Sequence, residues 1–225
     1  MLSSLMRAGH ALLMQPQCPI CRAAITSDTE CSKPCLNCCM KLDLPADGLR
    51  GFSPLNWRAL GWYEGHLRRL LLNLRRNRKL SAIHALAKLL TPLVPINAVL
   101  VPIPSWKSLS RTNPVPQLLA SSLCRPCHGL LRRRHATVGQ HHLDRQLRQR
   151  NQIHSFEAVP DLSNNATDWS FHQVWIVDDI LTTGATALAA RNCLQNLGIT
   201  VGGAICLAKT PKQKSKYNPK TIRNG

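Results

Sequence analysis

Apolar and polar positions along the chain follow two patterns, short continuous apolar runs and longer runs with a helical period. Continuous apolar runs rich in β-branched residues are typical of strands covered on both faces, as in a parallel sheet. The patterns predict strands over residues 55–63, 98–101, 174–177 and 199–207, and helices over 67–74, 82–90, 117–123 and 188–197. Strands that alternate with helices predict an α/β protein whose parallel sheet is flanked by helices.

The segment 174–186 reads V-W-I-V-D-D-I-L-T-T-G-A-T and combines a predicted strand, two carboxylates and a small turn before a helix. Asp178 and Asp179 are neighbouring acids in a chain with 11 Asp and Glu residues, and no acid follows them. The first turn of a helix offers unpaired backbone N–H groups and partial positive charge, which suit a phosphate. We therefore predict that the turn Thr182, Thr183, Gly184, Ala185 and Thr186 binds an anion.

The two carboxylates just before this turn suggest the rest of the ligand. Ionised carboxylates only accept hydrogen bonds, so they suit sugar hydroxyls or a divalent cation. A ligand that offers a phosphate to the turn and hydroxyl groups to the carboxylates would be a ribose 5-phosphate. The alternative is that Asp178 and Asp179 cap a helix and the threonines fill a tight turn.

The segment resembles the PRPP-binding loop of type I phosphoribosyltransferases. The resemblance implies that Asp178 and Asp179 are catalytic as well as PRPP-binding, and that Mg²⁺ accompanies the pyrophosphate. It also implies a pyrophosphate loop after the run Val-Pro-Ile-Pro at 101–104, with Ser105, Lys107 and Arg111 as donors. A proline-rich surface turn is the alternative for that loop.

The composition of the chain limits the classes of ligand that it is expected to bind and the cellular compartment in which we expect it. The chain has 225 residues, 44% of them hydrophobic, and a formal net charge of +18, which favours phosphorylated small molecules, nucleic acid or an acidic membrane surface. No apolar run is long enough to cross a bilayer, and no signal peptide is evident, so we expect a cytoplasmic location. The ten cysteines would then be reduced.

Two C-x-x-C pairs near the N-terminus predict a metal site. Cys18 with Cys21 and Cys35 with Cys38 are separated by thirteen residues, a spacing close to that of zinc ribbons. Four thiolates would give a structural Zn²⁺ its tetrahedral shell and drive folding of this small module. Cys31 or Cys39 could replace a ligand of this set, and a redox or incidental cluster is the alternative.

The remaining segments complete a division into three parts. Residues 1–50 are predicted to form the cysteine module and part of a Pro- and Gly-containing linker (41–54), residues 51–210 the phosphoribosyltransferase-like domain, and residues 211–225 a basic, disordered tail. The arginine-rich segment 125–150 predicts a mobile or solvent-facing stretch. Six basic residues between positions 68 and 79 indicate either a solvated helix face or an anion-binding surface.

Taken together, the motifs resemble the ComF family, also described as GntX-like, over residues 18–210. The likeness comprises the cysteine pairs, Tyr63 with its basic helix, the Val-Pro-Ile-Pro run, the acid–threonine segment, and a middle series formed by Thr137, Gln140, Leu143, Arg150, Asn151 and Phe156. The chain departs from the family where an Arg-Gly-Phe-Asn-Gln run is usual, because Arg111 is followed by Thr-Asn-Pro-Val-Pro-Gln.

The resemblance implies a PRPP-dependent glycosyltransferase linked to natural competence, in which incoming single-stranded DNA is handled with a helicase-like partner. The alternative is a non-catalytic adaptor that keeps the phosphoribosyltransferase fold and binds single-stranded DNA. Aromatic residues make up 4% of the chain, which argues against a tight dedicated single-strand binder.

Overall fold

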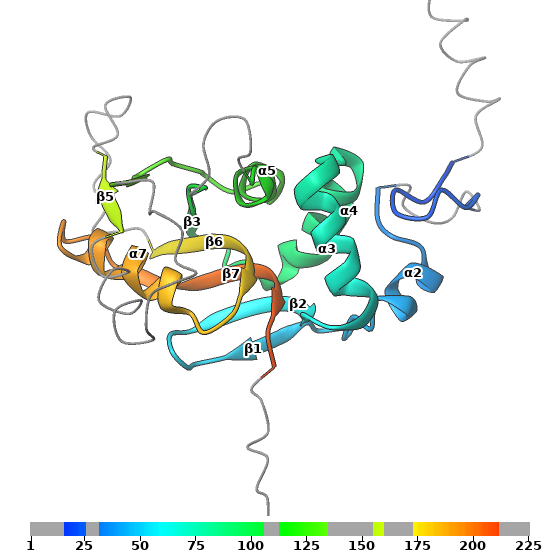
Figure 1. The fold of residues 1–225 in the computed structure, drawn as a ribbon, viewed down its shortest axis with the longest axis horizontal. Coiled ribbons are helices and arrows are strands. Elements are labelled where there is room, and N and C mark those ends of the chain that lie inside the picture. Colours follow the sequence, from blue (N-terminus) through cyan, green and yellow to red (C-terminus); the bar gives the residue numbers. More distant parts are fainter. Residues whose placement is uncertain (1–15, 26–31, 106–112, 135–154, 160–172, 212–225) are drawn as a thin grey trace, which may run out of the picture.

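The computed structural model describes residues 16–25, 32–105, 113–134, 155–159 and 173–211 (Figure 1). The elements follow in the order α2 (Leu36–Lys41), β1 (Leu49–Gly51), β2 (Trp57–Trp62), α3 (Gly65–Asn77), α4 (Leu80–Leu90), the 3₁₀ helix η1 (Thr91–Leu93), β3 (Ala98–Pro102), α5 (Val115–Ser122), β4 (Leu131–Arg133), β5 (Phe156–Ala158), β6 (Gln173–Leu181), α7 (Ala185–Gln195) and β7 (Val201–Lys209).

A mostly parallel, mixed sheet forms the centre of the fold. Its strand order is β1-β2-β7-β6-β3, and every neighbouring pair except β1 with β2 is parallel. The α/β class and the flanking helices agree with the sequence pattern. The antiparallel edge strand β1 was not predicted, since it lies within the segment 41–54 that we expected to be a linker.

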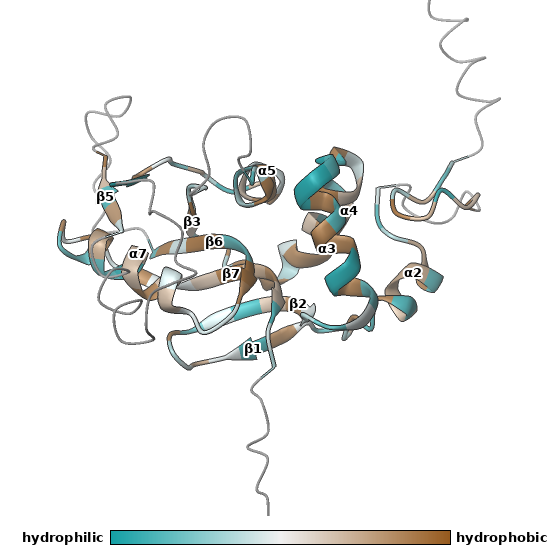
Figure 2. Cartoon of the chain, viewed as in Figure 1, coloured by the Kyte–Doolittle hydropathy of each residue, from teal (hydrophilic) through white to brown (hydrophobic). Residues whose placement is uncertain are grey.

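Alternate side chains of β6 supply two apolar cores, one on each face of the sheet. Trp175 and Val177 join α3, α4 and α5 in one core, whereas Val174 and Ile176 join α7 and the β4–β5 pair in the other. Burial on both faces explains why this strand reads as a continuous apolar run. Figure 2 shows hydrophobic colour along the central strands and hydrophilic colour on the outward turns of α3 and α4.

The strand β6 extends further than its apolar run predicted. We expected the two acids to follow the strand, but its pairing with β7 continues from Asp178 opposite Cys206 to Leu181 opposite Lys209. The reason is the length of β7, which offers backbone partners along all of this stretch. Asp178 and Asp179 therefore stand on a rigid strand, and α7 begins four residues after it ends, at Ala185.

The cysteine-containing segment lies at one end of the molecule, beyond α3 and α4 (Figure 1). Ile20 of this segment packs against the core formed by those helices, and Lys79 Nζ donates a hydrogen bond of 3.4 Å to its carbonyl oxygen. No helix in the described part of the chain has the length and apolar character needed to span a membrane. Nearly all of the expected C-terminal tail falls outside the described residues.

Candidate functional site

The turn between β6 and α7 has a conformation that needs glycine. Gly184 adopts φ +83°, in the left-handed region, and a Cβ at this position would lie 2.4 Å from Cγ of Pro54. Behind the turn, the buried Lys209 donates to the carbonyl oxygen of Thr182 over 2.5 Å. The turn is thus held between Pro54 and a buried ammonium group, whose charge adds to the positive potential at the start of α7.

Asp179 points to the face of the sheet covered by α3 and α5, where it is 1% exposed. Arg75 of α3 holds it with two hydrogen bonds, from Nε to Oδ2 at 2.5 Å and from Nη2 to Oδ1 at 2.7 Å. The side-chain amide of Asn113 donates to Oδ2 at 2.8 Å. This bonding to Asp179 raises the pKa of Arg75, so the guanidinium stays charged.

Asp178 has different surroundings. It is only partly buried, and within the described residues its carboxylate accepts one hydrogen bond, from the backbone N–H of Asp179 to Oδ1 at 2.8 Å. Burial, and then the neighbouring charge of Asp179, raise the pKa of Asp178 to about 8. A donor from a ligand would lower this pKa, because a hydrogen bond to the carboxylate favours its ionised form.

A cavity of about 380 Å³ brings the acids and the turn together at the carboxyl ends of β3 and β6. It is lined by Tyr63, Arg75, Ile103, Pro104, Ser105, Asn113, Pro116, Arg133, Asp178, Asp179, Ile180, Thr182 and Thr186. Of the residues that we predicted from the sequence, five therefore face one space: Ser105, both acids, Thr182 and Thr186.

The other predicted residues of the site do not line this cavity. Thr183, Gly184 and Ala185 build the turn, in which the N–H of Ala185 donates to Oγ1 of Thr183 at 3.4 Å. Lys107 and Arg111 lie outside the described residues. The carboxyl ends of parallel strands are the usual place for a ligand in such sheets, so the position agrees with the expected phosphate site.

Arg133 enters the cavity from a segment that sequence reasoning had assigned to solvent. Its Nε donates to the carbonyl oxygen of Pro104 at 3.1 Å, and its guanidinium lies 4.5 Å from the ring centre of Phe156. Burial lowers the pKa of Arg133, and the charge of Asp178 partly offsets this. The expectation of a solvent-facing stretch over 125–150 is therefore wrong at Leu131, which is buried, and at Arg133, which is partly buried, because this strand pairs with β5 and the buried Phe156.

Sequence reasoning also missed Tyr63, Arg75 and Asn113 as residues of the cavity. Arg75 was one of six basic residues near α3, and nothing in their spacing separates it from the others. Asn113 stood in the segment where the chain departs from the ComF pattern. The sequence offered one signal for both residues, because each lies in a segment that had been connected with anion binding. Such a signal points to a segment and does not identify the side chain that lines the cavity.

The four predicted cysteine ligands lie together in the N-terminal part of the chain. The sulfur atoms of Cys18, Cys21, Cys35 and Cys38 are all within 4.8 Å of one another, and the Cys18–Cys38 and Cys21–Cys35 pairs are both 3.8 Å apart. Zinc with Zn–S bonds of about 2.3 Å would place its tetrahedral sulfurs about 3.8 Å apart. The donor set and its dimensions therefore fit a metal ion such as zinc.

The electrostatics of the cluster also suit a cation. Burial opposes ionisation of Cys18, but hydrogen bonds from backbone N–H groups, that of Cys35 foremost, lower the pKa of its thiol to about 6. Burial raises the pKa of Cys38, and the other three thiols add to the effect. Burial also raises the pKa of Cys35, while its hydrogen bonds with Cys38 partly offset this rise. Cys39 stays outside the cluster and bonds to the carbonyl oxygen of Pro34 instead, and Cys31 lies outside the described residues.

A scan of the chain against protein-family models finds no matching family, and a search of curated proteins finds no match.

Proposed function

We propose that this protein binds PRPP, or another ribose 5-phosphate ligand, in the cavity at the carboxyl ends of β3 and β6, as a phosphoribosyltransferase-like protein resembling the ComF family. The observation that carries the proposal is the meeting of the turn 182–186, a partly buried acid and a partly buried arginine in one cavity of about 380 Å³. This volume lies within the range of typical small-molecule sites.

The 5-phosphate is assigned to the turn 182–186. Thr182 and Thr186 line the cavity there and offer hydroxyl donors, while the start of α7 offers backbone N–H groups. Lys209, bonded to the carbonyl of Thr182, adds a fixed positive charge close to the phosphate. These features together compensate the charge of a phosphate dianion.

The other end of the ligand is assigned to the side of the cavity formed by Ser105 and Arg133. A guanidinium presents several donors in a plane and binds phosphate oxygens in pairs, so Arg133 suits a pyrophosphate. Mg²⁺ is proposed to enter with the pyrophosphate and to neutralise part of its charge. Between the two anionic ends, a carboxylate next to the turn receives the ribose hydroxyls.

The chemistry proposed for this site is breakage of the C1–pyrophosphate bond and transfer of the ribose 5-phosphate group to a nucleophile. Positive charge develops on the sugar ring as that bond breaks, and a nearby carboxylate stabilises it. Guanidinium groups stabilise the negative charge on the departing pyrophosphate. The four-cysteine module is proposed to hold structural Zn²⁺ and to have no part in this step.

Calorimetric titration of the full chain with PRPP and Mg²⁺ tests this function. We expect saturable binding, competition by ribose 5-phosphate and no competition by ribose. Asp178→Asn should remove binding, whereas Asp47→Asn, which removes an exposed acid far along the chain, should leave it unchanged. Absence of saturable binding to the wild-type chain would refute the proposal.

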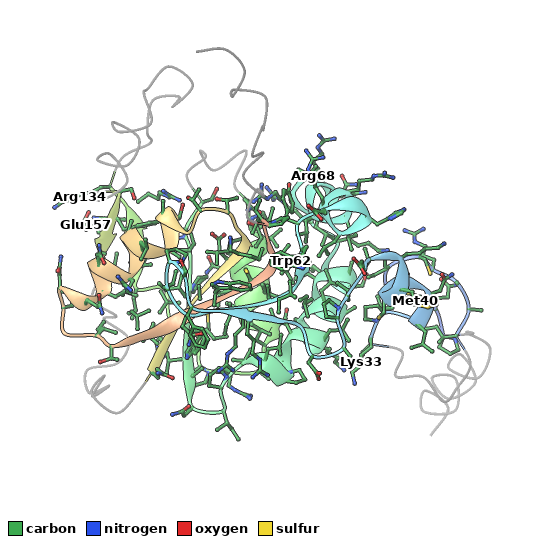
Figure 3. All side chains as sticks on the ribbon, turned by 90° about the horizontal axis from the view of Figure 1, so that it is seen from below. Lys33, Met40, Trp62, Arg68, Arg134 and Glu157 are labelled. Atoms are coloured by element: carbon green, nitrogen blue, oxygen red, sulfur yellow. The ribbon has the colours of Figure 1, made fainter. Side chains whose placement is uncertain are left out.

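A second candidate function is the handling of single-stranded DNA, linked to natural competence and a helicase-like partner. The observation that favours it is a set of exposed basic residues on α3, Arg68, Arg69 and Arg76, together with the partly exposed Trp62 at the end of the preceding strand β2. Arg68 projects from the edge of the molecule (Figure 3). Basic groups bind nucleic acid through its phosphates, and an aromatic ring offers a stacking surface.

Fluorescence anisotropy with a labelled single strand tests the DNA candidate. Affinity should fall steeply as salt rises, because binding releases counterions from the phosphates. Replacing Arg68 and Arg69 by Gln should reduce the slope of log affinity against log salt. A slope near zero in the wild-type chain would refute this candidate without affecting the PRPP proposal.

A further inference from the structure

Asp179 is held by the protein's own donors. It accepts three hydrogen bonds, two from Arg75 and one from Asn113, so three of its about four acceptor positions are used and both carboxylate oxygens take part. These partners come from different elements, since Arg75 belongs to α3 and Asn113 lies just before α5. The carboxylate therefore joins β6 to two separate parts of the cavity.

Asn113 also links Asp179 to Ser105 and to the start of α5. Its backbone N–H donates to Oγ of Ser105 at 2.9 Å, so the two ends of the segment 105–113 are tied together. Its side-chain oxygen accepts the N–H of Val115, the first residue of α5, at 3.2 Å. One side chain thus links Ser105, the start of α5 and Asp179.

Both acids line the cavity, but they differ in exposure and in hydrogen bonding. Asp178 is partly exposed, and its carboxylate accepts a single bond from a described residue, the adjacent backbone N–H. An ionised carboxylate has about four acceptor positions, so most of those on Asp178 are available once donors from a ligand stabilise its ionised form. Asp179 has three of its about four acceptor positions filled, so receiving two sugar hydroxyls would displace part of its pairing with Arg75.

We propose that the two acids have separate roles, an inference that rests on the proposed function. Asp178 receives the ribose hydroxyls. Asp179 is a positioning residue that, with Arg75 and Asn113, sets the Ser105 side of the cavity at a fixed distance from the phosphate turn. Arg75 neutralises the charge of Asp179, so one uncompensated carboxylate, rather than two, meets the phosphorylated ligand.

This assignment predicts a difference between a ligand that spans the cavity and one that fills half of it. PRPP touches both the turn and the Ser105 side, whereas ribose 5-phosphate needs the turn and Asp178. Loss of the positioning contacts should weaken PRPP by about tenfold, within the usual range for coupling between sites. It should change ribose 5-phosphate affinity by less than about twofold, the scatter expected for independent sites.

Calorimetry on full-length variants, with PRPP and Mg²⁺ or with ribose 5-phosphate as the probe, tests the assignment. Asp179→Asn and Arg75→Gln should each show the selective loss, and the double variant should lose no more than either alone, because both remove the same contact. Arg75→Lys should regain part of the affinity, since an ammonium can still donate to one carboxylate oxygen. Asp178→Asn should weaken both probes by more than about 100-fold, as expected for loss of charge-assisted bonds to two hydroxyls.

Two further variants provide a matched control and a second test in case the first variants do not fold. Arg76→Gln removes a neighbouring exposed charge from the same helix and should leave both affinities unchanged. Asn113→Ala removes the neutral donor without leaving a buried charge unpaired, so it covers the case in which the Asp179 or Arg75 variants fail to fold. It should reproduce the selective loss of PRPP affinity.

The outcomes separate this inference from the proposed function. If Asp179→Asn weakens ribose 5-phosphate as much as Asp178→Asn does, both acids contact the sugar and the separate roles are refuted, while the function stands. Additive losses for Arg75→Gln and Asp179→Asn would show that Arg75 binds the ligand directly and would also refute the positioning role. If the wild-type chain binds neither probe, the function and the inference are both overturned.

Discussion

The substitution Gly184→Ala tests whether the phosphate turn depends on its contact with Pro54. Gly184 and Gly198 lie at the two ends of α7 and share a left-handed backbone, with φ of +83° and +78°. A Cβ at position 184 would lie 2.4 Å from Cγ and 2.9 Å from Cδ of Pro54, whereas nothing lies within 4 Å of one at position 198. Gly198→Ala is therefore a matched control that carries the conformational cost alone.

The expected magnitudes follow from these two terms. A left-handed conformation costs a residue with a Cβ about 1–2 kcal/mol, and this applies at both positions. Forcing an extra carbon against the Pro54 ring adds about 1–3 kcal/mol, since a proline ring cannot rotate away as a flexible side chain would. We expect Gly184→Ala to lower the free energy of unfolding by about 2–5 kcal/mol and Gly198→Ala by about 1–2 kcal/mol.

Urea unfolding followed by circular dichroism measures both values, and calorimetry with ribose 5-phosphate measures the effect on the site. Gly184→Ala should also weaken ribose 5-phosphate, because the displaced turn no longer presents its N–H groups, whereas Gly198→Ala should not. Equal destabilisation by the two substitutions would show that the Pro54 contact does not constrain the turn. Unchanged ligand affinity in Gly184→Ala would show that the turn does not hold the phosphate.

Three other predictions concern the metal, the second arginine and pH. The purified chain should contain about one zinc ion by elemental analysis, and Cys38→Ala should remove it while Cys39→Ala keeps it, since Cys39 stands outside the cluster. Arg133→Gln should weaken PRPP about tenfold and spare ribose 5-phosphate in calorimetry, with the surface residue Arg132 as the matched control. The pKa of Asp178 is raised from 3.8 in the unfolded chain to about 8, so its contribution to stability is lost as the pH rises between these values. Asp178→Asn should therefore raise the melting temperature more at pH 8 than at pH 5 in thermal scans, and a larger effect at pH 5 would contradict the sign.

Local sequence patterns predicted the elements around β6 well, because the spacing of apolar residues in a segment reflects which of its faces are buried. The 174–177 run is apolar on both sides because two cores meet there, and it was predicted as a central strand. The periodicities at 67–74 and 82–90 became α3 and α4 with slightly wider bounds. The cysteine pairs likewise predicted a cluster, since a C-x-x-C spacing brings two sulfurs together locally and the second pair completes the set.

Other features were not predictable because they depend on partners distant in sequence. The edge strand β1 is only three residues long, follows Gly48 and ends at Gly51, so its sequence resembles a linker, and its strand structure depends on the hydrogen bonds that β2 supplies. Arg133 lies in an arginine-rich segment whose average composition predicts exposure to solvent. Its burial depends on Phe156 and Pro104, which lie more than twenty residues away in either direction.

The α/β class, the place of the acid pair before its turn and the pairing of the four cysteines were predictable, because these depend on the period, order and spacing of neighbouring residues. Which charges meet depends on how distant elements pack. Arg75 and Asp179 are 104 residues apart, and their contact arises from the packing of α3 on the sheet face to which Asp179 points. Two adjacent carboxylates that are alike in sequence thereby acquire different surroundings, because successive residues of a strand face opposite sides and meet different partners.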